Sequence, residues 1–423
     1  MITKIEARNF RSLKYIEQPL QSFHVLIGAN ASGKTTFLDI VGFIADIIKL
    51  GLDEAIWLRA SNFDDLTFSC LGGDIELVVE VSLPPEISKK LAHPGFDTIR
   101  YELALGLTED TKEHAIKEER AVLLDSRLLE NENKNYQPSL FPENKIEPKS
   151  ILNKKYKPAA FKYVIRKNPG GNDNFYDETC KEAEKDYIPS FKLGIKRSAL
   201  GNLPADETKF PASIWLKTLL QTGVQHFVLD SINMRNPSLP GQSYQFKTDG
   251  SNLPWVIENL SKDKKKFDQW IDHLKTALPD LENVFTIERQ EDKKRYIKVK
   301  YKNGIEVPSW LISDGTLRLL ALTIPAYLKD LTGVFLIEEP ENGIHPKAIE
   351  TVFLSLSSVY KAQVLIASHS PVVLGMVEPD QLMCFAKTTD GITDIVTGIN
   401  HPKLRDWRGN PNLNVLFASG ILS

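Results

Sequence analysis

One stretch near the N-terminus constrains the fold more than any other part of the chain: Gly28-Ala29-Asn30-Ala31-Ser32-Gly33-Lys34-Thr35. Its spacing fits G-x-x-x-x-G-K-[ST], a loop that joins a strand to a helix and cradles phosphate groups. The flanks agree, because residues 23–27 form a short apolar run and apolar residues recur at helical spacing over 37–51. Lys34 can reach phosphate oxygens, and the Thr35 hydroxyl can bind Mg²⁺.

Composition excludes several classes of protein. Of 423 residues, 42% are hydrophobic and 25% charged, as in ordinary globular proteins. A net charge of −3 gives no global attraction to nucleic acid. The three cysteines (Cys70, Cys180 and Cys384) are too scattered for a disulfide framework or a zinc site. The N-terminus lacks the apolar segment of a signal peptide, and no apolar run has transmembrane length. We therefore expect a cytoplasmic protein that does not contact membranes.

The residue pattern changes twice in the middle of the chain. Residues 1–27 are expected to form two strands, and alternating apolar residues from Asp74 to Leu124 indicate an antiparallel meander. Residues 126–158, rich in Asn, Lys, Glu and Pro, are expected to be a solvated surface insertion or a partner-binding one. From Pro211 the pattern becomes helical, and strands follow at 284–287 and 296–301. Two basic segments, 261–266 and 292–295, are explained by a helix end and a hairpin tip; DNA contact is the less favoured alternative.

Three further elements follow in the C-terminal part. Ser313-Asp314-Gly315-Thr316 precedes an apolar helix, where a hydroxyl and an amide suit an anion. An apolar strand, residues 333–337, ends in Glu338-Glu339, and carboxylates there can hold Mg²⁺ through water and polarise an attacking water. Another apolar strand, 364–367, ends in Ser368-His369, whose imidazole can hydrogen-bond a γ-phosphate. This order of elements is hard to explain by chance.

Together these pieces resemble the ABC-type ATPases of the SMC/RecF/OLD-like group, in particular its stand-alone members. The resemblance is dense at both ends of the chain and sparse in the middle. Its pieces are Asn9–Ser12, Gly28–Thr35, Arg235–Pro237, Asp249–Leu253, Ile312–Thr316, Leu336–Pro346, Ala367–Pro371 and Leu416–Leu422.

The resemblance implies ATP and Mg²⁺ as cofactors and a head-to-tail homodimer with nucleotide at its interface. Ser313 and Gly315 would contact the γ-phosphate bound by the opposite subunit. Thr35 and Glu338 would hold the metal, Glu339 would be the general base, Asn342–His345 the D-loop and His369 the switch, with Lys34 also catalytic. Nucleotide contacts are expected from Asn9, Arg11, Asn30, Ala31, Ser32, Gly33, Lys34, Thr35 and Thr36.

The implied fold class is α/β: an ABC-ATPase head with a mixed or parallel core sheet, an antiparallel β subdomain and a helical subdomain. We expect an N-terminal lobe at 1–204, a helical and hairpin subdomain at 205–302 and a C-terminal lobe at 303–423. The interval from the loop to Ser313 has no sustained heptads, so a long coiled-coil arm is not expected.

Three departures from the group's pattern affect these expectations. Glu338 stands where most P-loop proteins have Asp, so its longer side chain could hold the metal differently. No glutamine lies between Gln21 and Gln137 to serve as a Q-loop residue; Asn62, Asp64 or Asp65 are candidate substitutes. The chain also ends about where the ATPase lobe ends, so nuclease activity from a Toprim domain is not expected.

The sequence leaves the biological role open. Stand-alone ATPases of this type resemble sensor components of bacterial anti-phage or toxin–antitoxin-like systems, in which a separate nuclease or toxin is the effector. The alternatives are a RecF-like clamp on DNA and a non-catalytic scaffold that holds an effector inactive. A transporter ATPase is disfavoured by the Glu338–Asn342 and Ser313–Thr316 sequences.

Overall fold

The computed structural model describes residues 1–133, 147–152, 154, 156–167, 170–181, 187–329, 331–388 and 390–401. The chain divides into two compact units, each built from segments distant in sequence. Unit 1 contains residues 1–21, 30–224 and 386–395, and unit 2 contains 22–29, 225–385 and 396–423. The three-part division expected from the sequence stays a prediction. Leu416–Leu422 lies outside the described residues.

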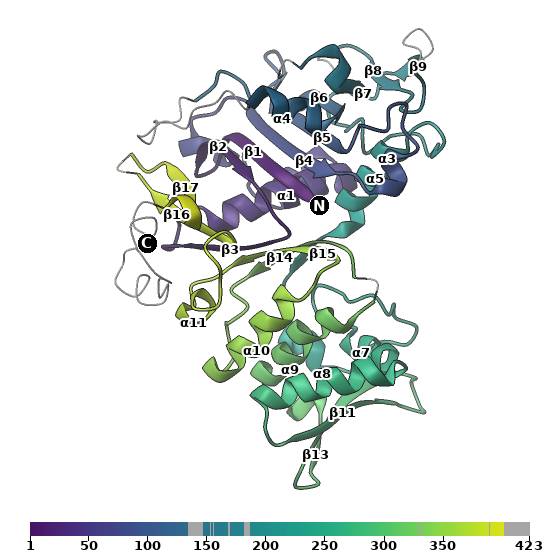
Figure 1. Cartoon of the computed structure of the whole chain (residues 1–423), viewed down its shortest axis with the longest axis vertical. Helices are drawn as coiled ribbons and strands as arrows, with labels where there is room; N and C mark the ends of the chain where they lie inside the picture. The colour runs from purple at the N-terminus through teal and green to yellow at the C-terminus, as the bar shows by residue number, and fades with distance from the viewer. Residues whose placement is uncertain are drawn as a thin grey trace. The chain divides into compact units, whose positions relative to one another are not determined.

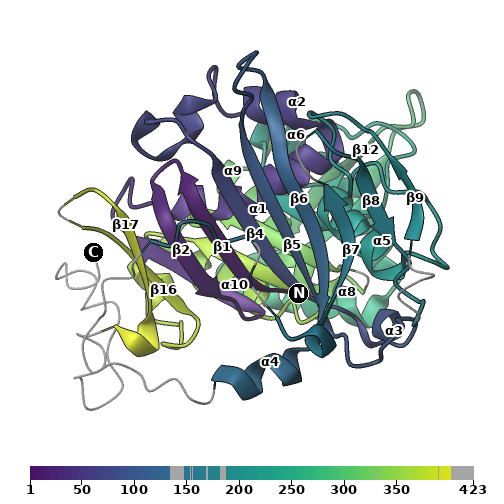
Figure 2. The same cartoon turned by 90° about the horizontal axis from the view of Figure 1, so that it is seen from above.

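Unit 1 is organised around an eight-stranded antiparallel sheet (Figure 1). Its strands, seen side by side in Figure 2, lie in the order β2 (Leu13–Pro19), β1 (Ile2–Phe10), β4 (Ile75–Ser82), β5 (Thr98–Leu107), β6 (His114–Leu124), β7 (Phe161–Lys167), β8 (Asp173–Tyr176) and β9 (Tyr187–Phe191). The predicted meander is confirmed, since β4, β5 and β6 pair in sequence order. Residues 1–27 form three strands, β1, β2 and β3, rather than the two expected.

The helices of unit 1 are α1 (Lys34–Leu50), α2 (Leu52–Trp57), α3 (Pro85–Ser88), α4 (Ser126–Asn133) and α5 (Pro211–Thr218). Helix α1 starts at the phosphate-loop lysine and packs on the sheet, where Phe43 stacks on Phe10 with ring centroids 5.6 Å apart. It ends at Gly51, whose φ of 97° suits glycine. The sequence prediction of a helix up to Gly51 is confirmed.

The predicted surface insertion at 126–158 is described in part, and it differs from a solvated loop in two places: its start forms helix α4, and Ile151 and Leu152 are buried. Ile151 and Leu152 are buried against Val78 and Ala104. The Ile151 carbonyl accepts from the buried Arg100 guanidinium at 2.9 Å, and its N–H donates to the Glu76 carboxylate at 2.7 Å. Hydrophobic burial and satisfied backbone polar groups hold this segment on the sheet, which a composition rich in polar residues did not reveal.

A six-stranded sheet, most of whose residues belong to unit 2, has the order β10 (Val224–Phe227), β14 (Gly333–Glu338), β15 (Ala362–Ala367), β3 (Phe23–Gly28), β16 (Leu382–Lys387) and β17 (Thr393–Thr397). The pairs β14–β15, β15–β3 and β3–β16 are parallel. Strands β3 and β15 are buried along their whole length, as expected for a parallel sheet covered on both faces. Short flanking helices are α6 (Ser231–Arg235) and α11 (Pro371–Leu374).

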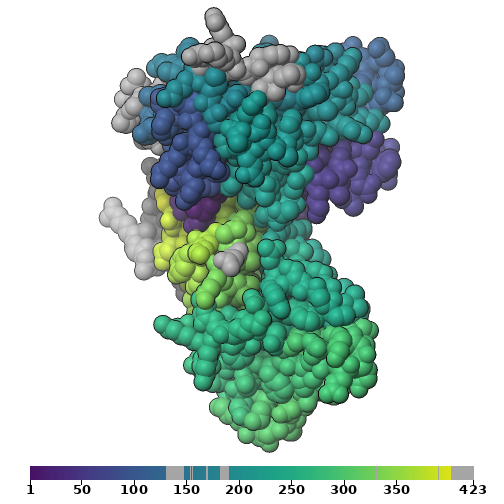
Figure 3. Space-filling model, turned by 90° about the vertical axis from the view of Figure 1, so that its right-hand side faces the viewer, coloured from purple at the N-terminus to yellow at the C-terminus, as the bar shows by residue number. Residues whose placement is uncertain are grey.

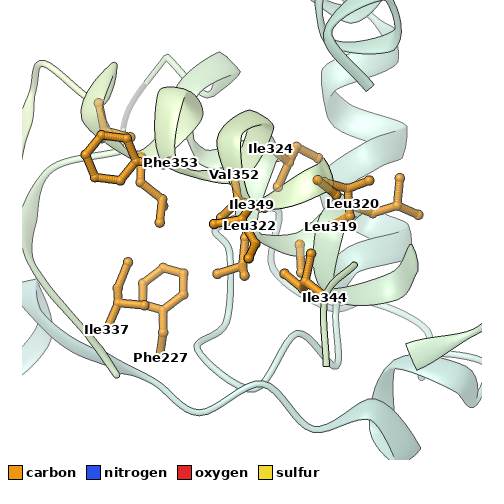
Figure 4. Close-up of a cluster of buried hydrophobic side chains, with 14 of the residues drawn as sticks. Phe227, Leu319, Leu320, Leu322, Ile324, Ile337, Ile344, Ile349, Val352 and Phe353 are labelled. Carbon is orange, nitrogen blue, oxygen red and sulfur yellow. The ribbon is translucent and has the colours of Figure 1, made fainter. Parts of the chain in front are cut away.

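Four longer helices and a small sheet complete unit 2. They are α7 (Leu253–Ser261), α8 (Lys264–Ala277), α9 (Asp314–Thr323) and α10 (Pro346–Ser357), with β11 (Leu281–Glu288), β12 (Arg295–Tyr301) and β13 (Glu306–Pro308). Side chains of α9 and α10 bury one face of the large sheet in a common core (Figure 4). The basic segments lie at the start of α8 and in the turn between β11 and β12, as expected. Figure 3 shows this helical and hairpin part in teal to green.

The predicted α/β class is confirmed, because the chain combines a mostly parallel core sheet with an antiparallel sheet and a helical region. Among the described residues, none of the helices has the length and apolar character needed to cross a membrane.

Candidate functional site

The chemistry-bearing residues of unit 2 gather at one edge of its parallel sheet. Strands β14, β15 and β3 are neighbours and run in the same direction, so their carboxyl ends meet. Glu338 ends β14, Ser368 follows β15, and Gly28 ends β3. The Ser368 N–H donates to the Leu26 carbonyl at 3.1 Å, which ties two of these ends together.

Glu339 has an unusual backbone at this edge. Its φ is 45°, a left-handed conformation that is strained for a residue with a Cβ. Its N–H donates to the Ala367 carbonyl at 2.8 Å, and the Asn342 side-chain amide donates to its carboxylate. His369 Nε2 lies 3.6 Å from Glu339 Oε1. The structure therefore brings Glu339, Asn342 and His369 together, and strain of about 1–3 kcal/mol at such a position is typical of a functional site.

Glu341 supports this arrangement, a role that the sequence analysis did not give it. Its Oε1 accepts from the Ser368 hydroxyl at 2.7 Å and from the His369 N–H at 2.8 Å. Its Oε2 is buried and has no hydrogen-bond partner among the described residues. The Glu341 carboxylate thus fixes the turn that presents His369, and only its position within Leu336–Pro346 could have pointed to it.

The Ser313–Thr316 loop is built for close backbone approach. Ser313 caps α9, since its hydroxyl accepts from the Thr316 N–H at 3.2 Å. A Cβ added to Gly315 would lie 2.7 Å from the Gly343 carbonyl oxygen, so a glycine is needed even without nucleotide. Arg235 holds the loop from the side, 2.8 Å from the Asp314 carboxylate and 3.1 Å from the Ile312 carbonyl.

Within unit 1, the rest of the phosphate loop has the backbone that its sequence predicts. Ala31 and Gly33 adopt positive φ values of 62° and 108°, and α1 starts directly after Gly33. Lys34 is 7% exposed. The Thr393 hydroxyl, from β17, donates to the Ser32 carbonyl at 2.9 Å. Thr393 was missed in the sequence, because no motif marks a residue more than 350 positions away.

Asn9 and Arg11, predicted nucleotide contacts, have structural partners in unit 1. The Asn9 amide donates to the Gly72 and Asp74 carbonyls, both at 3.1 Å, and its oxygen accepts from Phe68 at 3.0 Å. Arg11 pairs with Asp39 at 3.1 Å. Both have positive φ values, 58° and 51°, which these bonds stabilise.

The other residues predicted to contact nucleotide differ in how exposed they are. Thr36 accepts from the Ser12 hydroxyl at 3.4 Å, whereas Asn30 and Ala31 are exposed. Asn62, Asp64 and Asp65, the candidate substitutes for a Q-loop glutamine, are also exposed. Their contacts with nucleotide stay predictions.

The donors predicted for Mg²⁺ suit it chemically: a hydroxyl, Thr35, and a carboxylate, Glu338. Within the described part of the chain, no group of three or more His, Cys, Asp or Glu side chains could hold a metal by itself. An unforeseen imidazole, His226, also lies beside Glu338, with Nε2 3.2 Å from Oε1.

A family model described as "AAA domain, putative AbiEii toxin, Type IV TA system" matches residues 23–375, most of the chain. The chain belongs to this family. The resemblance to ABC-type ATPases drawn from the sequence is thereby confirmed, and the chain carries an ATP-binding domain of this type.

Individual relatives are more distant. The DNA replication and repair protein RecF of Nitrosococcus oceani is 51% identical over 41 residues, which cover 10% of this chain and 11% of RecF. The match thus spans about a tenth of this curated relative's length.

Solved structures of SMC heads are also similar. The SMC head bound to the C-winged helix domain of ScpA has 14% identity over 94% of this chain and 97% of that one, with a TM-score of 0.49. The head domain from Thermotoga maritima has 10% identity over 94% and 98%, with a TM-score of 0.42. The head domain with coiled coil and joint from Pyrococcus yayanosii has 11% identity over 99% of each chain, with a TM-score of 0.47.

Proposed function

We propose that this protein hydrolyses ATP slowly and that ATP drives it to form a homodimer, which acts as a switch. The observation that carries the proposal is the group at the sheet edge: Glu338 and Glu339 at the end of β14, with His369 at the end of the adjacent β15. Two carboxylates and an imidazole at the carboxyl ends of strands next to β3, the strand that leads into the phosphate-loop sequence, suit phosphoryl transfer to water.

In this proposal catalysis is electrostatic. Lys34 and the loop backbone neutralise phosphate charge, and bound Mg²⁺ would supply further positive charge. Glu339 orients the attacking water and accepts its proton. The Asn342 amide and the backbone bond to Ala367 keep the Glu339 carboxylate in place before substrate arrives, so little reorganisation is needed during the reaction.

The biological role we propose is the ATPase or sensor component of a bacterial anti-phage or toxin–antitoxin-like system with a separate effector. The family description, which names a toxin and a type IV toxin–antitoxin system, supports this role. A second candidate is a clamp on DNA, favoured by the local identity to RecF. The third candidate, a non-catalytic scaffold, would be favoured if nucleotide did not change the oligomeric state of the protein.

The deciding experiment is the solution mass of Glu339→Gln by light scattering, with and without ATP and Mg²⁺, and with and without double-stranded DNA. We expect a monomer that becomes a dimer only with ATP, and turnover that falls at least 100-fold. The control is Glu350→Gln, an exposed carboxylate on α10, which should behave as wild type. A fixed oligomer that ATP leaves unchanged would refute the switch. Salt-sensitive DNA binding that ATP strengthens would favour the clamp.

A further inference from the structure

His226 and Glu338 lie beside each other because of how their side chains alternate along the neighbouring strands β10 and β14. Phe227 is buried, with its ring 5.2 Å from that of Phe335, and Ile337 lies in the same core (Figure 4). Successive side chains of a strand point to opposite faces, so burial of Phe227 and Ile337 puts His226 and Glu338 on the other face. There His226 Nε2 is 3.2 Å from Glu338 Oε1.

The pair is accessible to solvent. The His226 side chain is 48% exposed and that of Glu338 26% exposed, so an ion or its water can reach both. A surface contact between two such side chains contributes little to stability, about 0–1 kcal/mol, so a purely structural role is a weak reason for its placement.

We propose that His226 and Glu338 together ligate the divalent ion and make the site select first-row transition ions, such as Mn²⁺, over Mg²⁺. This inference rests on the proposed function, in which Glu338 holds the metal. Two donors on one metal at bonds of about 2.1–2.2 Å and a right angle lie about 3 Å apart. The observed 3.2 Å separation fits such a pair.

The selectivity follows from the chemistry of the two donors. Mg²⁺ is a hard ion that takes oxygen ligands and gains little from an imidazole, whereas first-row transition ions gain affinity from an imidazole nitrogen, Mn²⁺ the least of the series. The glutamate also matters, because an aspartate at 338 is one methylene shorter and would retreat from His226 by about 1.5 Å. The glutamate at 338, in place of the usual aspartate, and the neighbouring His226 then serve the same purpose, which is to bind one ion together.

The test uses the full chain at pH 8 with ADP, so that no turnover occurs, and Mn²⁺ as the probe. Free Mn²⁺ is counted by its paramagnetic resonance signal while Mg²⁺ competes. Loss of even an outer-shell partner of a metal ligand costs about 10–100-fold in affinity, so we expect loss of the imidazole ligand in His226→Gln to weaken Mn²⁺ binding by at least about 10-fold and to change Mg²⁺ binding less than about 3-fold. Glutamine can still donate to Glu338, so it keeps a positioning hydrogen bond but removes the imidazole ligand. Glu338→Asp should shift selectivity toward Mg²⁺ in the same way.

A direct readout comes from protein labelled with ¹⁵N-histidine. Bound Mn²⁺ should show a ¹⁵N coupling in its electron spin echo, absent in His226→Gln and retained in the control His273→Gln. His273 is on α8, where it contacts Tyr327.

The outcomes separate the two proposals. If Mn²⁺ binding needs the Glu338 carboxylate but shows no ¹⁵N coupling, and His226→Gln leaves the Mn²⁺ to Mg²⁺ ratio unchanged, His226 only hydrogen-bonds Glu338 and the inference is wrong. If Glu338→Gln instead leaves metal binding unchanged, Glu338 is not a metal ligand, and the proposed function loses its metal site.

Discussion

Replacing Gly315 with alanine should destabilise the protein in the absence of nucleotide. The added Cβ would lie 2.7 Å from the Gly343 carbonyl oxygen, about 0.7 Å inside an ordinary contact of about 3.4 Å. Neither the backbone at Gly315 nor the backbone at Gly343 can move away without a cost in free energy. Ser313 caps the helix on one side, and on the other the Ile344 N–H donates to the Glu341 carbonyl at 3.1 Å.

The expected size follows from two opposing effects. Overpacking of this kind costs about 1–3 kcal/mol, and alanine in place of glycine in a helix returns up to about 1 kcal/mol. The net loss is about 1–2 kcal/mol, or a fall in Tm of about 2–8 °C if unit 2 melts as one body.

Gly42→Ala is the matched control. Gly42 lies inside α1, and its added Cβ would meet its nearest neighbours at 3.5 and 3.6 Å, which is ordinary contact. This variant should be stabilised by about 0.5–1 kcal/mol.

Thermal melts of both variants without nucleotide give the answer. A Gly315→Ala protein as stable as wild type would refute the steric argument. The glycine would then be needed only for nucleotide or for the opposite subunit.

Three other predictions concern different parts of the chain. Burial raises the pKa of Glu178 to about 7. Because this pKa is higher in the folded than in the unfolded protein, the stability that Glu178 contributes is full below about pH 4.5 and is lost as pH rises through 7. In thermal melts, wild type should therefore lose up to about 3 kcal/mol of stability between pH 5 and pH 8, and Glu178→Gln should not. Thr393→Val removes the hydroxyl bond to the Ser32 carbonyl and should weaken ATP affinity about 3–10-fold in a binding titration, whereas Thr393→Ser should stay within about 2-fold of wild type. Ser313→Ala should lose about 1 kcal/mol of stability with the helix cap, while Ser313→Asn, which keeps a cap acceptor, should match wild type in melts; equal losses in both would contradict the capping role.

Local sequence determined much of this protein. The phosphate loop, helix α1, the meander β4–β6 and the strands ending at Glu338 and Ala367 were all predicted. Their signals are short-range: apolar periodicity, glycine positions and polar residues at strand ends. The family match confirms the class of ATPase that these signals indicated.

Tertiary structure decided the contacts between residues far apart in the chain. Pairing Thr393 with Ser32, His226 with Glu338 and Gly315 with Gly343 depends on which strands and loops become neighbours. The same holds for Ile151, whose polar surroundings in sequence hide a buried position. No local pattern encodes such pairs, because their energy arises from packing and hydrogen bonds that exist only once the sheets have formed.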